Sequence, residues 1–202
     1  MSLGCRYLET DVHLTRDGEV VVLHDARLER TTDGAGLVAE YTFSELRRLD
    51  AGFRFGPAES YPWRGRGLTV PRFEELLELS EHARLNVELK SRDPRLLKRF
   101  WQLIEAHGLH DRVLVAAAAD SVVRDFRALS AGSVATSAGT REVTLFWAAC
   151  RAGISAWVPT DYDALQVPRC HGRLTVVDRG FVAAAHARGL QVHVWTVNDP
   201  AE

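Results

Sequence analysis

Residues 7–25 read YLETDVHLTRDGEVVVLHD, and the alternating polar and apolar side chains at the start of this stretch predict a β-strand over residues 5–15. Because strand side chains point alternately to opposite faces, Glu9, Asp11 and His13 should share one face. Glu9 and Asp11 then lie ~7 Å apart at their Cα atoms. Two carboxylates this close repel each other when buried, whereas a hard divalent cation binds both through oxygen.

A tight turn is predicted at Asp17-Gly18, followed by a second strand over residues 19–23. This hairpin delivers His24 and Asp25 to a strand end beside the acidic pair. Spacing alone is equally consistent with solvated carboxylates on an edge strand and a histidine in a turn.

The composition is that of an ordinary globular protein. The chain has 202 residues, of which 46% are hydrophobic and 26% charged, with a net charge of −2. One domain over residues 1–202 is expected, with no nucleic-acid partner and no membrane span. The cysteines Cys5, Cys150 and Cys170 form no C-x-x-C pair, so neither disulfides nor a zinc site is indicated. We expect a cytoplasmic location.

Helical and strand-like segments alternate after residue 70, which predicts an α/β fold with a parallel sheet and right-handed crossovers. Helices are expected at 71–82, 93–107, 120–129, a segment ending at 151–153, and 178–188, and strands at 85–90, 112–117, 133–137, 156–159 and 191–197.

Residues 26–68 break this pattern and are rich in Gly, Pro and Arg. One helical piece is predicted over residues 42–49, capped by Thr42 or Ser44. A segment this long is either a functional excursion or a plain surface loop.

Seven stretches together resemble the glycerophosphodiester phosphodiesterase family. They are ETDV (9–12), LTRDG (14–18), VVLHD (21–25), LERTTDGAG (28–36), VPRFEE (70–75), LNVELK (85–90) and WTVND (195–199). The resemblance implies a TIM (β/α)8-type barrel in which residues 26–68 are an insertion, after the first hairpin, that covers the site. By the family's strand count the barrel is incomplete at both ends, so a second copy of the chain or further segments should cover its open edges.

The resemblance also implies roles for individual residues. Glu9, Asp11 and Glu88 would be the metal ligands, for one Ca²⁺ or Mg²⁺ ion. His24 would transfer protons, Lys90 would face a phosphate oxygen, and Trp195 would line the substrate pocket. From spacing alone, Glu88 and Lys90 could form a plain salt bridge and Trp195 could serve packing.

The function implied is metal-dependent hydrolysis of a small-molecule glycerophosphodiester to an alcohol and glycerol 3-phosphate. Two alternatives stay open. The family's His-Arg-Gly strand, with a second catalytic histidine, is absent from these residues, which favours a non-catalytic remnant that binds metal and phosphate. A relative that cleaves lysophospholipid headgroups would keep the same three carboxylates and differ only in its pocket.

Overall fold

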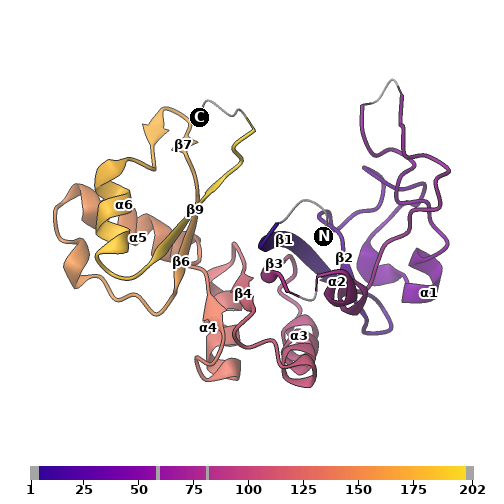
Figure 1. Cartoon of the computed structure of the whole chain (residues 1–202), viewed down its shortest axis with the longest axis horizontal. Coiled ribbons are helices and arrows are strands. Elements are labelled where there is room, and N and C mark those ends of the chain that lie inside the picture. The colour runs from indigo at the N-terminus through magenta and orange to yellow at the C-terminus, as the bar shows by residue number, and fades with distance from the viewer. Residues whose placement is uncertain (1–4, 58–59, 81, 199–202) are drawn as a thin grey trace. The chain divides into compact units, whose positions relative to one another are not determined.

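The computed structural model describes residues 5–57, 60–80 and 82–198, and the chain divides between Val113 and Leu114 into two compact units (Figure 1). Both units contain helices and strands, as an α/β chain should. Within the described ranges, no helix combines the length and apolar character needed to cross a bilayer.

β1 (Tyr7–Leu14) lies between two partners in the sheet of the first unit. It pairs antiparallel with β2 (Val20–Val22) and parallel with β3 (Arg84–Leu89). The strand and the hairpin predicted for residues 5–23 are therefore both present.

The turn between β1 and β2 depends on Asp17 and Gly18. Gly18 adopts φ +87°, a conformation that favours glycine. The Asp17 carboxylate accepts hydrogen bonds from Thr15 Oγ1 at 2.6 Å and from the backbone N–H of Phe43 at 3.0 Å. Asp17 thus closes the turn and ties it to the segment that follows β2.

One face of this sheet is apolar and buried. Val12 on β1 and Leu85, Val87 and Leu89 on β3 are at most 2% exposed. Two helices supply apolar partners, α2 (Phe73–Leu79) and α3 (Pro94–His107), whose buried rings Phe73 and Phe100 meet edge to face with centroids 5.0 Å apart. Because alternate strand residues point the other way, the carboxylates of β1 and β3 are left on the opposite face.

The segment 26–68 has a small core of its own. It contains η1 (Val38–Glu40) and α1 (Phe43–Leu46), which is shorter than the helix predicted over 42–49. Thr42 caps α1, because its hydroxyl accepts from Glu45 N at 3.3 Å. The buried side chains of this core are Val21, Leu28, Val38, Leu46 and Val70. Because Val21 belongs to β2, the core joins the segment to that strand. The segment is therefore packed against the sheet, and its role as a cover of the site stays a prediction.

The second unit alternates strands and helices as predicted. Its elements are β4 (Val113–Ala116), α4 (Asp120–Ser130), β5 (Ala135–Thr136), α5 (Thr140–Arg151), η2 (Ser155–Trp157), β6 (Ala164–Pro168), β7 (Cys170–His171), β8 (Leu174–Thr175), α6 (Arg179–His186) and β9 (Gln191–Trp195). β4 pairs parallel with β5 and β6 pairs parallel with β9, while β7 and β8 form a hairpin that the sequence did not predict. Phe146 and Phe181 join α5 to α6, edge to face at 5.7 Å.

The strand predicted over residues 156–159 was wrong, because the chain there forms η2. The guanidinium of Arg188 donates to three carbonyl oxygens of this region, those of Ser155 at 2.8 Å and of Ala156 and Val158 at 3.0 Å. Backbone carbonyl groups that a strand would use to pair with a neighbouring strand are therefore hydrogen-bonded to a side chain instead. The strand of this region comes later, as β6.

Candidate active site

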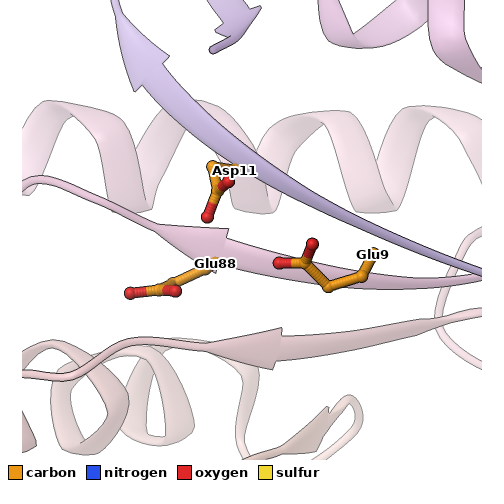
Figure 2. Close-up of side chains that lie close together, drawn as sticks. All are labelled: Glu9, Asp11 and Glu88. Atoms are coloured by element: carbon orange, nitrogen blue, oxygen red, sulfur yellow. The ribbon is translucent and has the colours of Figure 1, made fainter. Parts of the chain in front are cut away.

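Three carboxylates meet on the polar face of β1 and β3. Asp11 lies opposite Glu88 in the parallel register, and Glu9 lies opposite Asn86. Residues opposite each other in adjacent strands point to the same face, so Glu9, Asp11 and Glu88 share one side of the sheet. Figure 2 shows the three side chains lying close together, Glu9 and Asp11 from β1 and Glu88 from β3.

One carboxylate oxygen from each of Glu9, Asp11 and Glu88 lies within 4.8 Å of the other two. Lys90, one residue beyond β3, places its Nζ 3.0 Å from Asp11 Oδ1 and 2.8 Å from Glu88 Oε2. The Lys90 side chain is 21% exposed and that of Asp11 is 12% exposed. Three negative charges and one positive charge are therefore concentrated in a partly shielded space.

This crowding changes the proton affinity of the cluster. Partial loss of hydration, followed by the negative charges of Asp11 and Glu88, raises the pKa of Glu9 above its usual range, although Lys90 and His24 oppose this. Burial alone would lower the pKa of Lys90, but its hydrogen bonds to Glu88 and Asp11 raise it instead. Lys90 is thus held as a cation, and the negative charge of the cluster exceeds what Lys90 alone neutralises.

The donor set suits a hard divalent cation. All three candidate ligands are carboxylates, which calcium and magnesium prefer, and there is neither thiolate nor imidazole among them to favour zinc. A cation between the three groups would also relieve the repulsion that, after burial, contributes to the raised pKa of Glu9. The residues present therefore fit the ion predicted from the sequence, and their role as its ligands stays a prediction.

His24 lies two residues beyond the end of β2. The backbone N–H of the preceding residue, Leu23, donates to Asp11 O at 3.1 Å, so β1 holds this end of the hairpin. The His24 side chain is 62% exposed, and its Nδ1 lies 2.5 Å from Asp25 Oδ1. An accessible imidazole with one nitrogen engaged is suited to proton transfer at the other.

Asp25 is itself held by Arg30. Arg30 Nη2 donates to Asp25 Oδ1 at 3.2 Å, and Arg30 Nε donates to Asp25 Oδ2, so both carboxylate oxygens are engaged. The hydrogen bond from Arg30, with a further one from His24, lowers the pKa of Asp25 to about 2 although burial opposes the shift. Asp25 is therefore ionised at neutral pH.

A second histidine, His13, contacts the backbone of His24. His13 is 5% exposed, and its Nε2 lies 3.2 Å from the carbonyl oxygen of His24. Because a carbonyl only accepts, Nε2 carries the proton of this bond. Burial lowers the pKa of His13, which keeps the ring neutral at neutral pH. No role was predicted from the sequence for His13, Asp25 or Arg30, although the His24-Asp25 pair and Arg30 belong to the motifs VVLHD (21–25) and LERTTDGAG (28–36).

Trp195 lies in the second unit, at the last residue of β9, with 55% of its surface exposed. Two residues earlier on the same strand, His193 Nε2 lies 3.0 Å from Gln191 Oε1, and burial lowers the pKa of His193. The contact of Trp195 with substrate stays a prediction.

Comparisons with known proteins agree with the motifs. The chain is 33% identical over 202 residues to a probable glycerophosphodiester phosphodiesterase of Mycobacterium tuberculosis, covering 98% of this chain and 70% of that protein. It is 23% identical over 227 residues to a lysophospholipase D of Mus musculus, covering all of this chain and 71% of that protein. Alignments with three other curated phosphodiesterases cover 37% to 53% of their lengths.

Solved structures show the same fold. A phosphodiesterase of Oleispira antarctica, determined in complex with the product sn-glycerol-3-phosphate, superposes with a TM-score of 0.77 at 24% identity, covering 99% of this chain and 76% of that one. The TIM-barrel class of α/β fold predicted from the sequence is thereby confirmed. The family model for glycerophosphoryl diester phosphodiesterases matches residues 1–202. The chain therefore belongs to the glycerophosphoryl diester phosphodiesterase family, an enzyme family, as its motifs predicted.

Proposed function

We propose that this chain hydrolyses glycerophosphodiesters to an alcohol and glycerol 3-phosphate, using one divalent cation held by Glu9, Asp11 and Glu88. The observation that carries the proposal is the convergence of these three carboxylates within 4.8 Å on the polar face of β1 and β3. Membership of the family supports it, as does the product complex of the Oleispira antarctica phosphodiesterase.

The cation, when bound, would neutralise charge on the phosphodiester and orient it for attack. The carboxylates hold that cation, and Lys90 offers a fixed positive charge beside it for a phosphate oxygen. The attacking group would be the substrate's neighbouring glycerol hydroxyl, and water would complete the hydrolysis. Trp195, with its exposed ring, would contact the organic part of the substrate.

His24 would carry the proton transfer. Its Nδ1 faces Asp25 Oδ1 at 2.5 Å, which leaves Nε2 for exchange with the substrate. A neutral ring takes a proton at Nε2 from an attacking hydroxyl, and a protonated ring gives one from Nε2 to a leaving alkoxide. The same atom therefore serves as base or acid, depending on the step.

We expect Ca²⁺ or Mg²⁺ as the ion, because all the ligands are carboxylates. The test is a coupled assay of glycerol 3-phosphate release from glycerophosphocholine by the full chain. Chelator should abolish the activity, and added Ca²⁺ or Mg²⁺ should restore it. Glu9→Gln should weaken ion binding in calorimetry, and His24→Asn should stop turnover without changing ion binding.

Two results would count against this proposal. Tight ion binding with no turnover of any glycerophosphodiester would identify the chain as a binding remnant. Full activity after chelation, with no ion bound, would show that the three carboxylates serve another purpose.

A second candidate function is cleavage of lysophospholipid headgroups, which the similarity to the mouse lysophospholipase D over the whole chain favours. The same carboxylates and histidine would serve, because both reactions break a phosphodiester bond. Release of choline from lysophosphatidylcholine, compared with release from glycerophosphocholine, separates the two functions. If kcat/KM is higher for lysophosphatidylcholine than for glycerophosphocholine, the lysophospholipid is the preferred substrate.

We also propose a cytoplasmic location. The three cysteines, Cys5, Cys150 and Cys170, are free, which a reducing compartment allows. Subcellular fractionation of the source cells with an antibody against the chain tests this, and recovery in an extracellular fraction would contradict it.

A further inference from the structure

The contacts around His24 determine which of its ring nitrogens carries a proton. Asp25 Oδ1 lies 2.5 Å from His24 Nδ1, and an ionised carboxylate can only accept a hydrogen bond. Nδ1 is therefore the donor and holds its proton in both the neutral and the charged ring. In the neutral ring, Nε2 then has a free lone pair.

Arg30 keeps Asp25 in place for this task. The guanidinium engages both carboxylate oxygens from Nε and Nη2, a two-point contact that sets the plane of the carboxylate as well as its position. The Asp25 side chain is 27% exposed, whereas those of Arg30 and His24 are 58% and 62% exposed. Asp25 is thus the least exposed member, between two more exposed partners.

The backbone of His24 is fixed independently of its ring. His13, almost completely buried, donates from Nε2 to His24 O at 3.2 Å, and the N–H of Leu23 donates to Asp11 O at 3.1 Å. Contacts to the main chain therefore hold the Cα of His24, and Asp25 holds its ring at Nδ1. An imidazole held at both places loses little orientation freedom when substrate binds.

We propose that Asp25, clamped by Arg30, is a positioning residue that fixes the Nδ1–H tautomer and the orientation of His24, so that Nε2 is the atom that moves the proton. This inference rests on the proposed function only in taking His24 as the proton-transfer group. In this role Asp25 acts through His24.

The first test needs no turnover. Long-range ¹H–¹⁵N spectra of the full chain, without substrate and above the pH at which the rings charge, report the tautomer of each histidine, and the signals lost in His24→Asn identify His24. We expect the Nδ1–H form to predominate in the wild type and to lose that predominance in Asp25→Asn, whose side chain has nearly the same shape. A wild-type His24 mainly in the Nε2–H form would overturn the proposal.

The second test uses steady-state kinetics with glycerophosphocholine. Asp25→Asn should lower kcat ~10–100-fold and leave KM within about twofold, since a misplaced proton-transfer group affects the chemical step. Arg30→Met should lower kcat by a smaller factor, ~3–10-fold, because Asp25 would remain but be less firmly held. Arg27→Met is the matched control: Arg27 is 63% exposed in the same segment and pairs with Glu29 at 2.5 Å. It should leave kcat unchanged.

The variants also separate this inference from the proposed function. If His24→Asn retains wild-type activity, His24 is not the proton-transfer group and the mechanism proposed above fails. If His24→Asn is inactive while Asp25→Asn has wild-type kcat, the mechanism survives and the positioning role of Asp25 is wrong. Thermal melting of each variant shows whether a lost activity reflects a lost fold. Asp25→Glu provides a second substitution at this position in case Asp25→Asn does not fold.

Discussion

Asp11 and Glu88 lie opposite each other in the parallel register of β1 and β3, and the ammonium of Lys90 contacts both carboxylates, at 3.0 and 2.8 Å. The two acids come from distant parts of the chain, with the packed segment 26–68 and α2 between them. Their meeting is a consequence of sheet register. A shift of β3 by one residue would turn Glu88 to the buried face and abolish the cluster.

Replacing Glu88 by Gln should weaken calcium binding at least ~10-fold, because one of the three proposed charged ligands is lost. Without the ion, the variant should be at least as stable as the wild type, since a like charge is removed from the cluster. Calorimetric titration and thermal melting in chelator measure the two effects. Glu78→Gln, on an exposed position of α2, is the matched control and should change neither.

Replacing Lys90 by Met should have opposite effects on the ion-free and ion-bound protein. The ion-free protein should become less stable, because three carboxylates lose their counter-charge, whereas ion affinity should rise a few-fold since a competing cation is gone. KM for substrate should also rise. The only other lysine, the exposed Lys98 on α3, supplies the control Lys98→Met. Unchanged ion affinity in Lys90→Met would mean that Lys90 does not compete for the carboxylates.

The low pKa of Asp25, about 2, has a consequence for acid stability. A carboxyl whose pKa is lower in the folded than in the unfolded state contributes stability above its unfolded pKa of ~3.9, and loses it as the pH falls through the folded value. The facing charged groups are His24 and Arg30. The free energy of unfolding of the wild type minus that of Asp25→Asn should therefore shrink between pH ~4 and ~2.

Urea denaturation of the wild type and of Asp25→Asn at each pH measures this difference in the free energy of unfolding. The contributions of all other carboxyl groups are common to both proteins and cancel in the subtraction. Asp125→Asn is the control, because its carboxylate accepts from the neighbouring Arg124 on an exposed stretch of α4. A difference for Asp25→Asn that stays constant from pH 6 to pH 2 would show that Arg30 does not stabilise the ionised carboxylate.

In the second unit, Arg127→Met should destabilise the fold by ~2–3 kcal/mol. The Arg127 guanidinium, 15% exposed, donates to Thr136 Oγ1 at 2.9 Å, to Ser137 O at 2.8 Å and to both oxygens of Glu142. Its loss leaves these acceptors without a donor in a partly buried space. Chemical denaturation measures the change. Arg124→Met, which removes a guanidinium 72% exposed on the same helix, should cost less than ~0.5 kcal/mol.

Trp195→Ala should raise KM for glycerophosphocholine at least ~5-fold while leaving ion affinity unchanged, since a lost aromatic contact weakens substrate binding without altering the carboxylates. Trp157→Ala is the control, because Trp157 is 86% exposed on η2 and no role in substrate binding is proposed for it. Equal KM values for the two variants would remove Trp195 from the substrate pocket.

Local features of the fold were predictable wherever neighbouring residues decide them. The alternation of β1, the Asp17-Gly18 turn and the Thr42 cap each depend on side chains a few positions apart, and each is present. The strand predicted over residues 156–159 failed for the opposite reason. Its backbone acceptors are engaged by Arg188, which no local pattern links to them.

The sequence by itself determined which residue types are available for chemistry and which of them share a face: Glu9, Asp11 and His13 alternate along one strand whatever the rest of the chain does. The family resemblance grouped Glu88 with Glu9 and Asp11, but only the tertiary structure decided how strand register brings the three together, that His13 supports the backbone of His24, and that Arg30 clamps Asp25. The reason is physical. Side-chain direction along a strand follows from local backbone geometry, whereas strand register and side-chain contacts depend on how the buried faces pack.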